Sequence, residues 1–402
     1  MSVFTSVGDW SFYCGACVQT VGKPGGFRDP KRYLWALGLI APASALLPSQ
    51  LVYHTKAEVL WWIGPVIVLI AIPILDWIVG EDGNNPRDED YEALSADRYY
   101  RWCTYLFLPV QLIGLVIACV MWTGDELDVL DKLGLAATVG FVSGIGINAA
   151  HELGHRVERA ERLLSKIALA QSGYGHFFVE HNRGHHARVA TPEDPASARL
   201  GESLWEFLPR SVIGGFRSAV QLERSRLARQ GRGWWSAGNN ILQAWAMSAV
   251  LFGSLILVFG PGIIPWLVLQ AFVGIGLLEA VNYVEHYGLL RARKPNGRYE
   301  RCSPRDSWNS DRLVTNIFLF HLQRHSDHHA NPGRRYQTLR STSESPQLPA
   351  GYATMLLLAA VPPLWRAVMD PKVAAHYGGD LSLANVAPPK PRRLLARNRA
   401  TA

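Results

Sequence analysis

Charged residues are scarce in this 402-residue sequence, where Asp, Glu, Lys and Arg make up 18% and hydrophobic residues 49%. Soluble proteins usually carry about 25% charged residues. The apolar residues also gather in six uncharged runs, each near the ~20 residues that a membrane-spanning helix requires. These runs cover residues 33–52, 59–75, 103–122, 133–150, 241–259 and 261–278. The sequence therefore predicts a polytopic membrane protein and argues against a soluble fold.

Cysteine is equally scarce, and its spacing gives no disulfide framework. Cys14 and Cys17 form a lone CxxC, whereas a four-cysteine iron or zinc site needs a second such pair. The N-terminus also lacks the compact apolar segment and small-residue cleavage site of a secretory signal peptide. We expect the first spanning helix to act as its own insertion signal. The five cysteines are Cys14, Cys17, Cys103, Cys119 and Cys302.

The distribution of Lys and Arg predicts the orientation in the membrane. The short connections at 53–58, 123–132 and around Pro261 carry few cations, and the remaining segments between the runs hold nearly all of them. By the positive-inside rule those basic segments face the cytoplasm, so six helices pair as three hairpins with both termini inside. The formal charge of +7 is therefore a topology signal and does not indicate a nucleic-acid partner.

We predict an all-α membrane protein, a six-transmembrane-helix bundle with a cytoplasmic helical cap. Helical patterns at 161–178 and 313–323 belong to that cap. The expected segments are a cytoplasmic N-terminal segment (1–32), transmembrane helices 1–4 (33–150), a first cap segment (151–240), helices 5–6 (241–284), a second cap segment (285–387) and a basic tail or linker (388–402).

Nine of the 13 histidines fall into four clusters at the predicted cytoplasmic ends of helices or in the cap. Neutral imidazole is a common ligand of iron, zinc and copper. HxxxH and HxxHH spacing lets two rings from one helical face reach a metal together. The clusters are HELGH (His151, His155), EHNRGHH (His181, His185, His186), NYVEHYG (His286) and LQRHSDHH (His325, His328, His329).

The HELGH stretch alone is typical of zinc proteases, in which Glu152 would serve as general base. A single zinc takes three or four protein ligands, so this interpretation leaves most of the clustered histidines unexplained. Nine candidates suit two metal ions with four or five imidazoles each. A metal transporter is the remaining alternative, but it would spread histidines along a membrane path, whereas these gather at one face.

Polar neighbours support a site at the membrane boundary, because ionisable residues inside spanning segments are costly and are functional candidates. Asn148 shares a helix stripe with His151 and His155, and Glu279 and Asn282 share one with His286. Four carboxylates adjoin the clusters, and each is expected either to accept the free N–H of a ligating imidazole or to pair with an arginine of the cap. They are Glu152, Glu180, Glu285 and Asp327; His176 and His321 are likewise expected to hydrogen-bond near the metal.

Taken together, the four motifs resemble those of the bacterial membrane alkane hydroxylases (alkane 1-monooxygenases), within the membrane di-iron superfamily of fatty-acid desaturases and hydroxylases. HELGHR, EHNRGHH and LQRHSDHH are similar to that family's three histidine boxes, and NYVEHYGL to the motif that distinguishes alkane hydroxylases from most desaturases. The resemblance covers most of 140–340 and the six-helix plan. Arg156 replaces a common Lys at a position that is not a ligand.

The resemblance implies two irons held by the nine histidines, O₂ as oxidant and hydroxylation of the terminal methyl of n-alkanes in the bacterial inner membrane. It implies electrons from rubredoxin and an NADH-dependent rubredoxin reductase; a fused rubredoxin domain would need two CxxC pairs. Desaturation of fatty acids or oxidation of an aromatic methyl by the same superfamily stays open.

Two further sets of residues follow from this expectation. An alkane offers nothing to hydrogen-bond, so an apolar channel must select it by shape, and Gly140 and Gly144 would let the fourth helix pack closely beside that channel. The cytoplasmic face is expected to dock rubredoxin at Arg334 and Arg335, unless these arginines bind lipid phosphates or internal carboxylates. The proposed channel residues are Trp61, Trp62, Ile113, Leu115 and Phe141.

Overall fold

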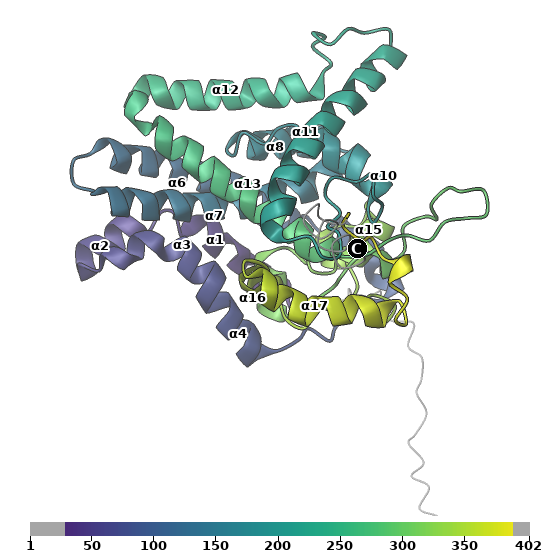
Figure 1. Ribbon diagram of the computed structural model, residues 1–402. Helices are drawn as coiled ribbons and strands as arrows, with labels where there is room; N and C mark the ends of the chain where they lie inside the picture. Colours follow the sequence, from purple (N-terminus) through teal and green to yellow (C-terminus); the bar gives the residue numbers. More distant parts are fainter. Residues whose placement is uncertain (1–28, 389–402) are drawn as a thin grey trace, which may run out of the picture.

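The computed structural model describes residues 29–388, and every regular element in this part of the chain is a helix (Figure 1). Cys14, Cys17 and the basic tail from 389 onward lie outside the described residues. Five helical stretches are long and apolar enough to cross a membrane, and a bent pair makes a sixth candidate. The prediction of an all-helical membrane protein is therefore confirmed.

The five continuous candidates follow the predicted apolar runs closely. The first of them changes between 3-10, α and π geometry, and it contains α3 (Ile63–Val66) and α4 (Ile72–Val79). The others are regular α-helices for most of their length. The stretches are Glu58–Val79, α6 (Arg98–Thr123), α7 (Val129–Gly154), α12 (Asn240–Phe259) and Pro261–His286, which contains α13 (Ile264–His286).

The run predicted at 33–52 is a broken element, not one straight span. A 3-10 stretch and α1 (Ile40–Ala43) occupy its first half, α2 (Pro48–Thr55) its second, and the two halves are bent by 73°. Pro42 and Pro48 lack the backbone N–H of a continuous helix, and their rings clash with the preceding turn. The run therefore bends where the sequence places its prolines.

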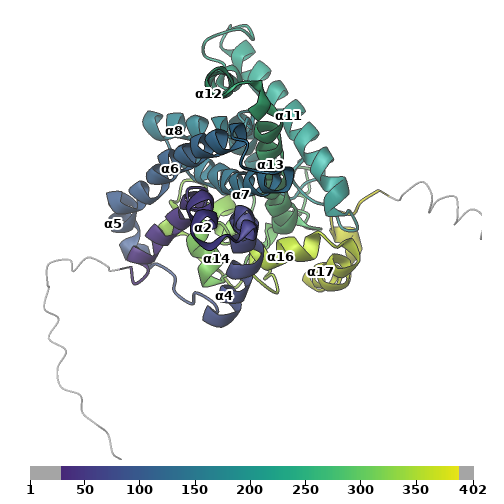
Figure 2. The same ribbon diagram turned by 90° about the vertical axis from the view of Figure 1, so that its left-hand side faces the viewer.

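Helix α7 occupies the centre of the bundle, with α6, α8 and α13 around it (Figure 2). A Cβ at Gly140 would lie 2.6 Å from the Val273 side chain, and one at Gly144 would lie 3.0 Å from the carbonyl of Gly274. Only glycine allows α7 and α13 to approach this closely, as predicted for the Gly140–Gly144 pair. The ends of α7 and α13 that carry histidine consequently lie together.

The first predicted cap segment departs from expectation, because α8 (Arg159–Ala170) packs among the bundle helices α6, α7 and α12. The Gln171 side chain donates to the carbonyl of Leu108 in α6, and Gln270 of α13 donates to the carbonyl of Gln171. Side-chain hydrogen bonds thus engage polar groups at the buried C-terminal end of α8, as an apolar environment requires. At 12 residues, α8 is too short to register as a spanning run.

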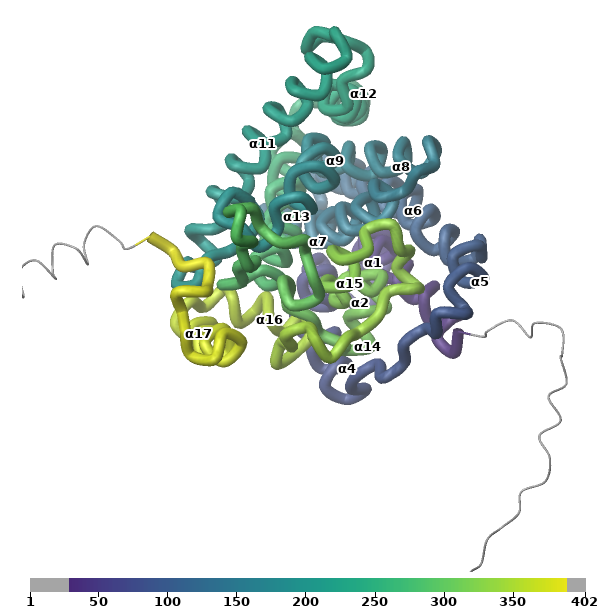
Figure 3. Tube along the Cα trace, turned by 90° about the vertical axis from the view of Figure 1, so that its right-hand side faces the viewer, coloured from purple at the N-terminus to yellow at the C-terminus, as the bar shows by residue number. Residues whose placement is uncertain are grey.

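The other helices surround the histidine-bearing end of the bundle, where α15 lies near the middle in Figure 3. The predicted helix at 313–323 is shorter in the structure, because Phe320 and His321 have positive φ angles of 51° and 54°. These elements are α5 (Tyr91–Ala96), α9 (Phe177–Val179), α10 (His186–Arg188), α11 (Leu204–Arg229), α14 (Leu313–Phe318), α15 (His325–Ala330), α16 (Tyr352–Ala359) and α17 (Pro362–His376).

Replacing Gly140 by Leu should destabilise the protein, because the new side chain would overlap Val273 across the α7–α13 contact. Overpacking of this kind costs about 1–3 kcal/mol. Thermal unfolding in detergent would measure the loss. Gly276→Leu is the matched control on α13, since a Cβ there meets no atom within 4 Å; equal losses in both variants would contradict the packing argument.

Candidate metal centre

The nine clustered histidines lie together in two groups. Within each group the candidate ligand nitrogens all lie within 4.8 Å of one another. This grouping agrees with the expected four or five imidazoles for each of two ions. The first group is His151, His155, His181, His186 and His328, and the second is His185, His286, His325 and His329.

The Nε2 atoms converge at the separations expected around one ion. In the first group, Nε2 of His151 lies 2.8 Å from that of His328, and Nε2 of His181 lies 3.0 Å from that of His155. In the second, Nε2 of His329 lies 2.9 Å from that of His325. Two nitrogens about 2.1 Å from a shared ion, at roughly right angles, are about 3 Å apart. The geometry therefore fits metal ligation.

Burial favours the ligand form of these side chains. For six histidines outside the membrane-spanning stretches, burial holds the pKa well below the ordinary histidine value, so that their imidazoles are neutral. A neutral imidazole has a lone pair available for a metal. The six are His155, His181, His186, His325, His328 and His329.

The second histidine motif forms a π-helix over Glu180–His185. In an α-helix, residues five apart lie about 140° from each other around the axis. The wider π turn brings Nε2 of His186 to 3.0 Å from that of His181, while His185 turns to the second group. His151 and His155, four residues apart, thus belong to the same group. His181 and His185, also four residues apart, belong to different groups.

Gly184 leaves room for the Glu180 side chain beside this π turn. A Cβ there would lie 2.4 Å from the Glu180 carboxylate, which folds back over the turn. The carboxylate accepts a hydrogen bond from Arg188 at 2.8 Å, and burial raises the pKa of Glu180 to about 7. π turns inside helices are frequent at functional sites.

Asp194 is a supporting residue that the sequence reasoning missed. Its Oδ2 lies 2.9 Å from Nδ1 of His185 and accepts from the Ser197 hydroxyl at 2.6 Å. Burial alone would raise the pKa of Asp194, but His185 and Ser197 hold it at about 2. The carboxylate fixes the ring so that Nε2 points to the other histidines. Nothing in the spacing distinguishes Asp194 from its neighbour Glu193.

Three of the four predicted carboxylates pair with arginine instead of histidine. Glu152 binds Arg156 at 2.8 Å and also accepts from the backbone N–H of Tyr336. Glu180 binds Arg188, and Asp327 binds Arg334. Because both Glu152 oxygens are engaged in this way, the carboxylate is not poised as the general base of a zinc protease.

Glu285 is the exception, since its Oε2 lies 3.1 Å from Nε2 of His325. This nitrogen is the one that faces the second group, so the carboxylate oxygen approaches the ligand side of that group. Glu279 and Asn282 lie further up α13 and hydrogen-bond each other at 3.3 Å. Both line a polar cavity that also touches His181 and His185.

His176 and His321 lie outside both groups. His176 lines the same polar cavity as Glu279 and packs edge-on against Tyr174. His321 contacts Lys31 at 3.3 Å and the carbonyl of Tyr336 at 2.8 Å. The His321 ring is thus engaged by Lys31, Asp82 and a backbone carbonyl and by none of the nine clustered histidines.

The two arginines expected to dock a partner are engaged inside the protein. Arg335 is buried and binds Glu158 and Glu161. Arg334 binds Asp327, and its backbone carbonyl accepts from Arg156 at 2.9 Å. The structure thus favours internal carboxylates over an exposed docking surface at this pair, which corrects the prediction.

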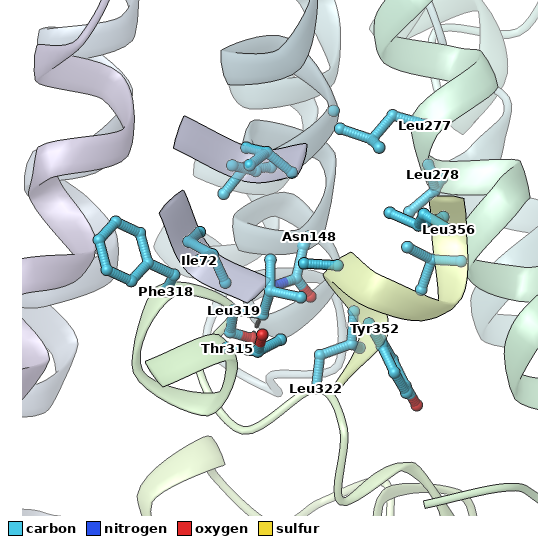
Figure 4. A pocket seen from close by; sticks show the side chains of 15 residues that line it. Ile72, Asn148, Leu277, Leu278, Thr315, Phe318, Leu319, Leu322, Tyr352 and Leu356 are labelled. Atoms are coloured by element: carbon cyan, nitrogen blue, oxygen red, sulfur yellow. Dashed lines mark hydrogen bonds between the residues drawn. The ribbon is translucent and has the colours of Figure 1, made fainter. Parts of the chain in front are cut away.

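An apolar cavity of 510 Å³ adjoins the centre, and we call it the proximal cavity (Figure 4). Asn148 lines it one helical turn before His151, and Leu322 lines it three residues before His325. Tyr352, another lining residue, has its pKa raised by burial and then by the nearby Glu285 carboxylate. The proximal cavity therefore reaches the immediate surroundings of both groups.

The predicted channel residues lie elsewhere, with one exception. Ile113 is exposed, whereas Trp61, Trp62 and Leu115 belong to a separate apolar cluster toward the other end of the bundle. Phe141 lines a smaller cavity beside the proximal one. The sequence could not locate the channel, because its walls come from α14 and α16 as well as from the predicted spans.

Comparison with known proteins adds independent information. The sequence profile described as fatty acid desaturase matches residues 132–388. The alkane 1-monooxygenase of Acinetobacter baylyi is 45% identical over 92% of this chain and 91% of its own length. That of Pseudomonas putida is 44% identical over 89% of each chain. The xylene/toluene monooxygenase hydroxylase component of Pseudomonas putida is 26% identical over 77% of this chain and 81% of its own.

Replacing Asp194 by Asn should weaken metal binding by about 10- to 100-fold, the usual effect of removing a carboxylate that orients a ligating histidine. Competition with a chelator, followed by metal analysis, would measure the change. Glu193→Gln is the matched control, because Glu193 is adjacent but exposed. Unchanged affinity in Asp194→Asn would show that the His185 ring needs no such support.

Proposed function

Because this chain belongs to the alkane 1-monooxygenases of the fatty acid desaturase family, we propose that it hydroxylates the terminal methyl of medium- to long-chain n-alkanes to primary alcohols. The observation that supports this reaction most directly is the proximal cavity, an apolar chamber whose lining includes Asn148, one helical turn before His151, and Leu322, three residues before His325. A hydrocarbon bound there has its end at the metal and its length among apolar side chains.

The lining of the proximal cavity favours a substrate without a head group. Among the described residues that line it there is no Lys or Arg to bind a carboxylate. The Asn148 amide donates to the carbonyl of Leu319, and the Thr315 hydroxyl donates to Asp76. With these polar atoms engaged, a fatty acid would lose the hydration of its carboxylate without gaining a partner. An alkane loses nothing of this kind.

Two irons are the metals we assign to the histidine groups. Imidazole suits iron as well as zinc, but five imidazoles in the first group exceed the tetrahedral set of a structural or catalytic zinc. Bound iron would supply the activation of O₂ and the attack on a strong C–H bond. The chain holds the imidazoles neutral and convergent, orients His185 through Asp194, and keeps water from the apolar cavity.

Purified protein should contain about two irons per chain and should convert octane to 1-octanol when reductant and O₂ are supplied. His155→Ala and His325→Ala remove one proposed ligand from each group, so each should abolish turnover and lower the iron content. His54→Ala is the control, since His54 is exposed and outside both groups. One zinc per chain, or normal turnover of His325→Ala with full iron, would contradict the assignment.

Rubredoxin, reduced by an NADH-dependent reductase, is the electron donor we propose, with the centre at the cytoplasmic side of a bacterial inner membrane. A projecting segment, residues 291–305, offers a site for an acidic carrier, and we call it the basic hairpin. Its exposed cations are Arg293, Lys294, Arg298, Arg301 and Arg305.

The base of the basic hairpin is tied to both histidine groups. Arg291 donates to the carbonyl of Ala187, which follows His186, and Arg301 donates to the carbonyl of Ala330, which follows His329. A carrier bound on the exposed cations would therefore be separated from the centre by only a short stretch of protein. Opposite charges would speed its encounter, and salt would screen them over about 8 Å.

Charge reversal at Lys294 and Arg298, both to Glu, should lower the apparent kcat/KM for rubredoxin by roughly tenfold at low salt. Iron content and turnover with a small-molecule reductant should stay unchanged. Arg229, the exposed last residue of α11, and Arg232, in the exposed loop that follows, both replaced by Glu, form the control. Equal effects of the two double variants would exclude the basic hairpin as the docking site.

A further inference from the structure

A second, smaller apolar cavity lies next to the proximal cavity, and we call it the distal cavity. It has an empty volume of about 230 Å³ and lies among α1, α3, the neighbouring π-helix, α7 and α14. Three residues, Val68, Ile145 and Phe318, line both cavities. The two cavities therefore lie next to each other, with these three residues between them.

The distal cavity lies farther from the metal centre along α7. Asn148, in the proximal cavity, precedes His151 by three residues, or ~4.5 Å of helix rise. Phe141, in the distal cavity, precedes it by ten residues, or ~15 Å. A chain that enters the proximal cavity with one end at the histidines would reach the distal cavity only with its far end.

Phe318 is the largest of the three shared side chains and sits at the end of α14. Figure 4 shows its ring on one side of the proximal cavity together with Ile72, opposite Leu277 and Leu356. The ring is buried, with 8% of the residue exposed. It therefore fills the position where the proximal cavity would otherwise continue into the distal one.

Hydrogen bonds hold α14, and with it the ring, in place. Asp76 accepts from the backbone N–H of Thr315 at 3.0 Å and from its hydroxyl. The Asn148 amide donates to the carbonyl of Leu319 at 2.7 Å. Asp76, Thr315 and Asn148 are buried, so displacing α14 would leave buried polar groups unsatisfied. The backbone that carries the Phe318 ring is thus held in place on both sides of that residue.

We propose that Phe318 sets the upper limit of substrate chain length by closing the proximal cavity to the distal one. This inference rests on the proposed hydroxylation of n-alkanes. Alkanes that fit the proximal cavity place the terminal methyl at the metal centre and their tail against the ring. Longer chains meet the ring before the methyl is correctly placed, and a misplaced reacting group loses rate steeply.

Replacing Phe318 by Ala should join the cavities and raise the ratio of kcat/KM for hexadecane to that for octane by about tenfold or more, since a few methylenes in an apolar pocket discriminate on this scale. Phe318→Leu opens the passage partly and should shift the ratio in the same direction by less. Competition between the two alkanes, with product analysis, measures the ratio independently of enzyme concentration. Iron content reports whether each variant has folded.

Two further variants make the test specific. Phe107→Leu removes a buried phenylalanine that lines neither cavity, and it should leave the ratio unchanged. Ala41→Leu in the Phe318→Ala background refills the distal cavity and should restore the octane preference. Iron-loaded Phe318 variants with the wild-type ratio would overturn this inference alone. Wild-type protein that oxidises neither alkane would overturn the proposed function and this inference together.

Discussion

The close contact between α7 and α13 is the constraint on which the metal centre depends. Gly140, Gly144 and Gly274 let the two backbones approach until a Cβ on either helix would overlap the other. In a membrane such contacts replace the hydrophobic effect as the source of helix association. His151 and His286 lie at the ends of these two helices, so the packing of the glycines determines how close the first and second histidine groups can be.

Buried ion pairs carry the third histidine motif to those helix ends. Arg156, one turn beyond Glu152, donates to the carbonyls of Gly333 and Arg334, just after the motif. Arg324, directly before His325 in the motif, binds Asp82 and Asp311. Buried pairs of this kind contribute little net stability but fix geometry, because breaking one leaves an uncompensated charge. The side chains of Arg156 and Arg324 thus hold the third histidine motif in place beside the other ligands.

The features that follow from local pattern were predictable from the sequence, and those that depend on tertiary contacts were not. Uncharged runs located the spans, and histidine clustering located the candidate ligands. The division of His181 from His185 depends on a π turn that Gly184 permits, and no periodicity indicates it. Asp194 orients the His185 ring only because the turn around Asp194 folds against that histidine. Likewise the sequence did not place α8 in the bundle, since its 12 residues are too few for a spanning helix.

The two histidine groups cannot move independently, because neighbouring residues supply different groups. His185 and His186 are adjacent in sequence, as are His328 and His329, and in each pair one residue belongs to the first group and the other to the second. Adjacent Cα atoms are about 3.8 Å apart, so two separate stretches of backbone fix the spacing between the groups. The rings of His186 and His329 also pack with centroids 4.3 Å apart across the boundary. A pair of ions held in this way would keep its separation without a carboxylate bridge, which explains how a centre with mostly neutral ligands can be rigid.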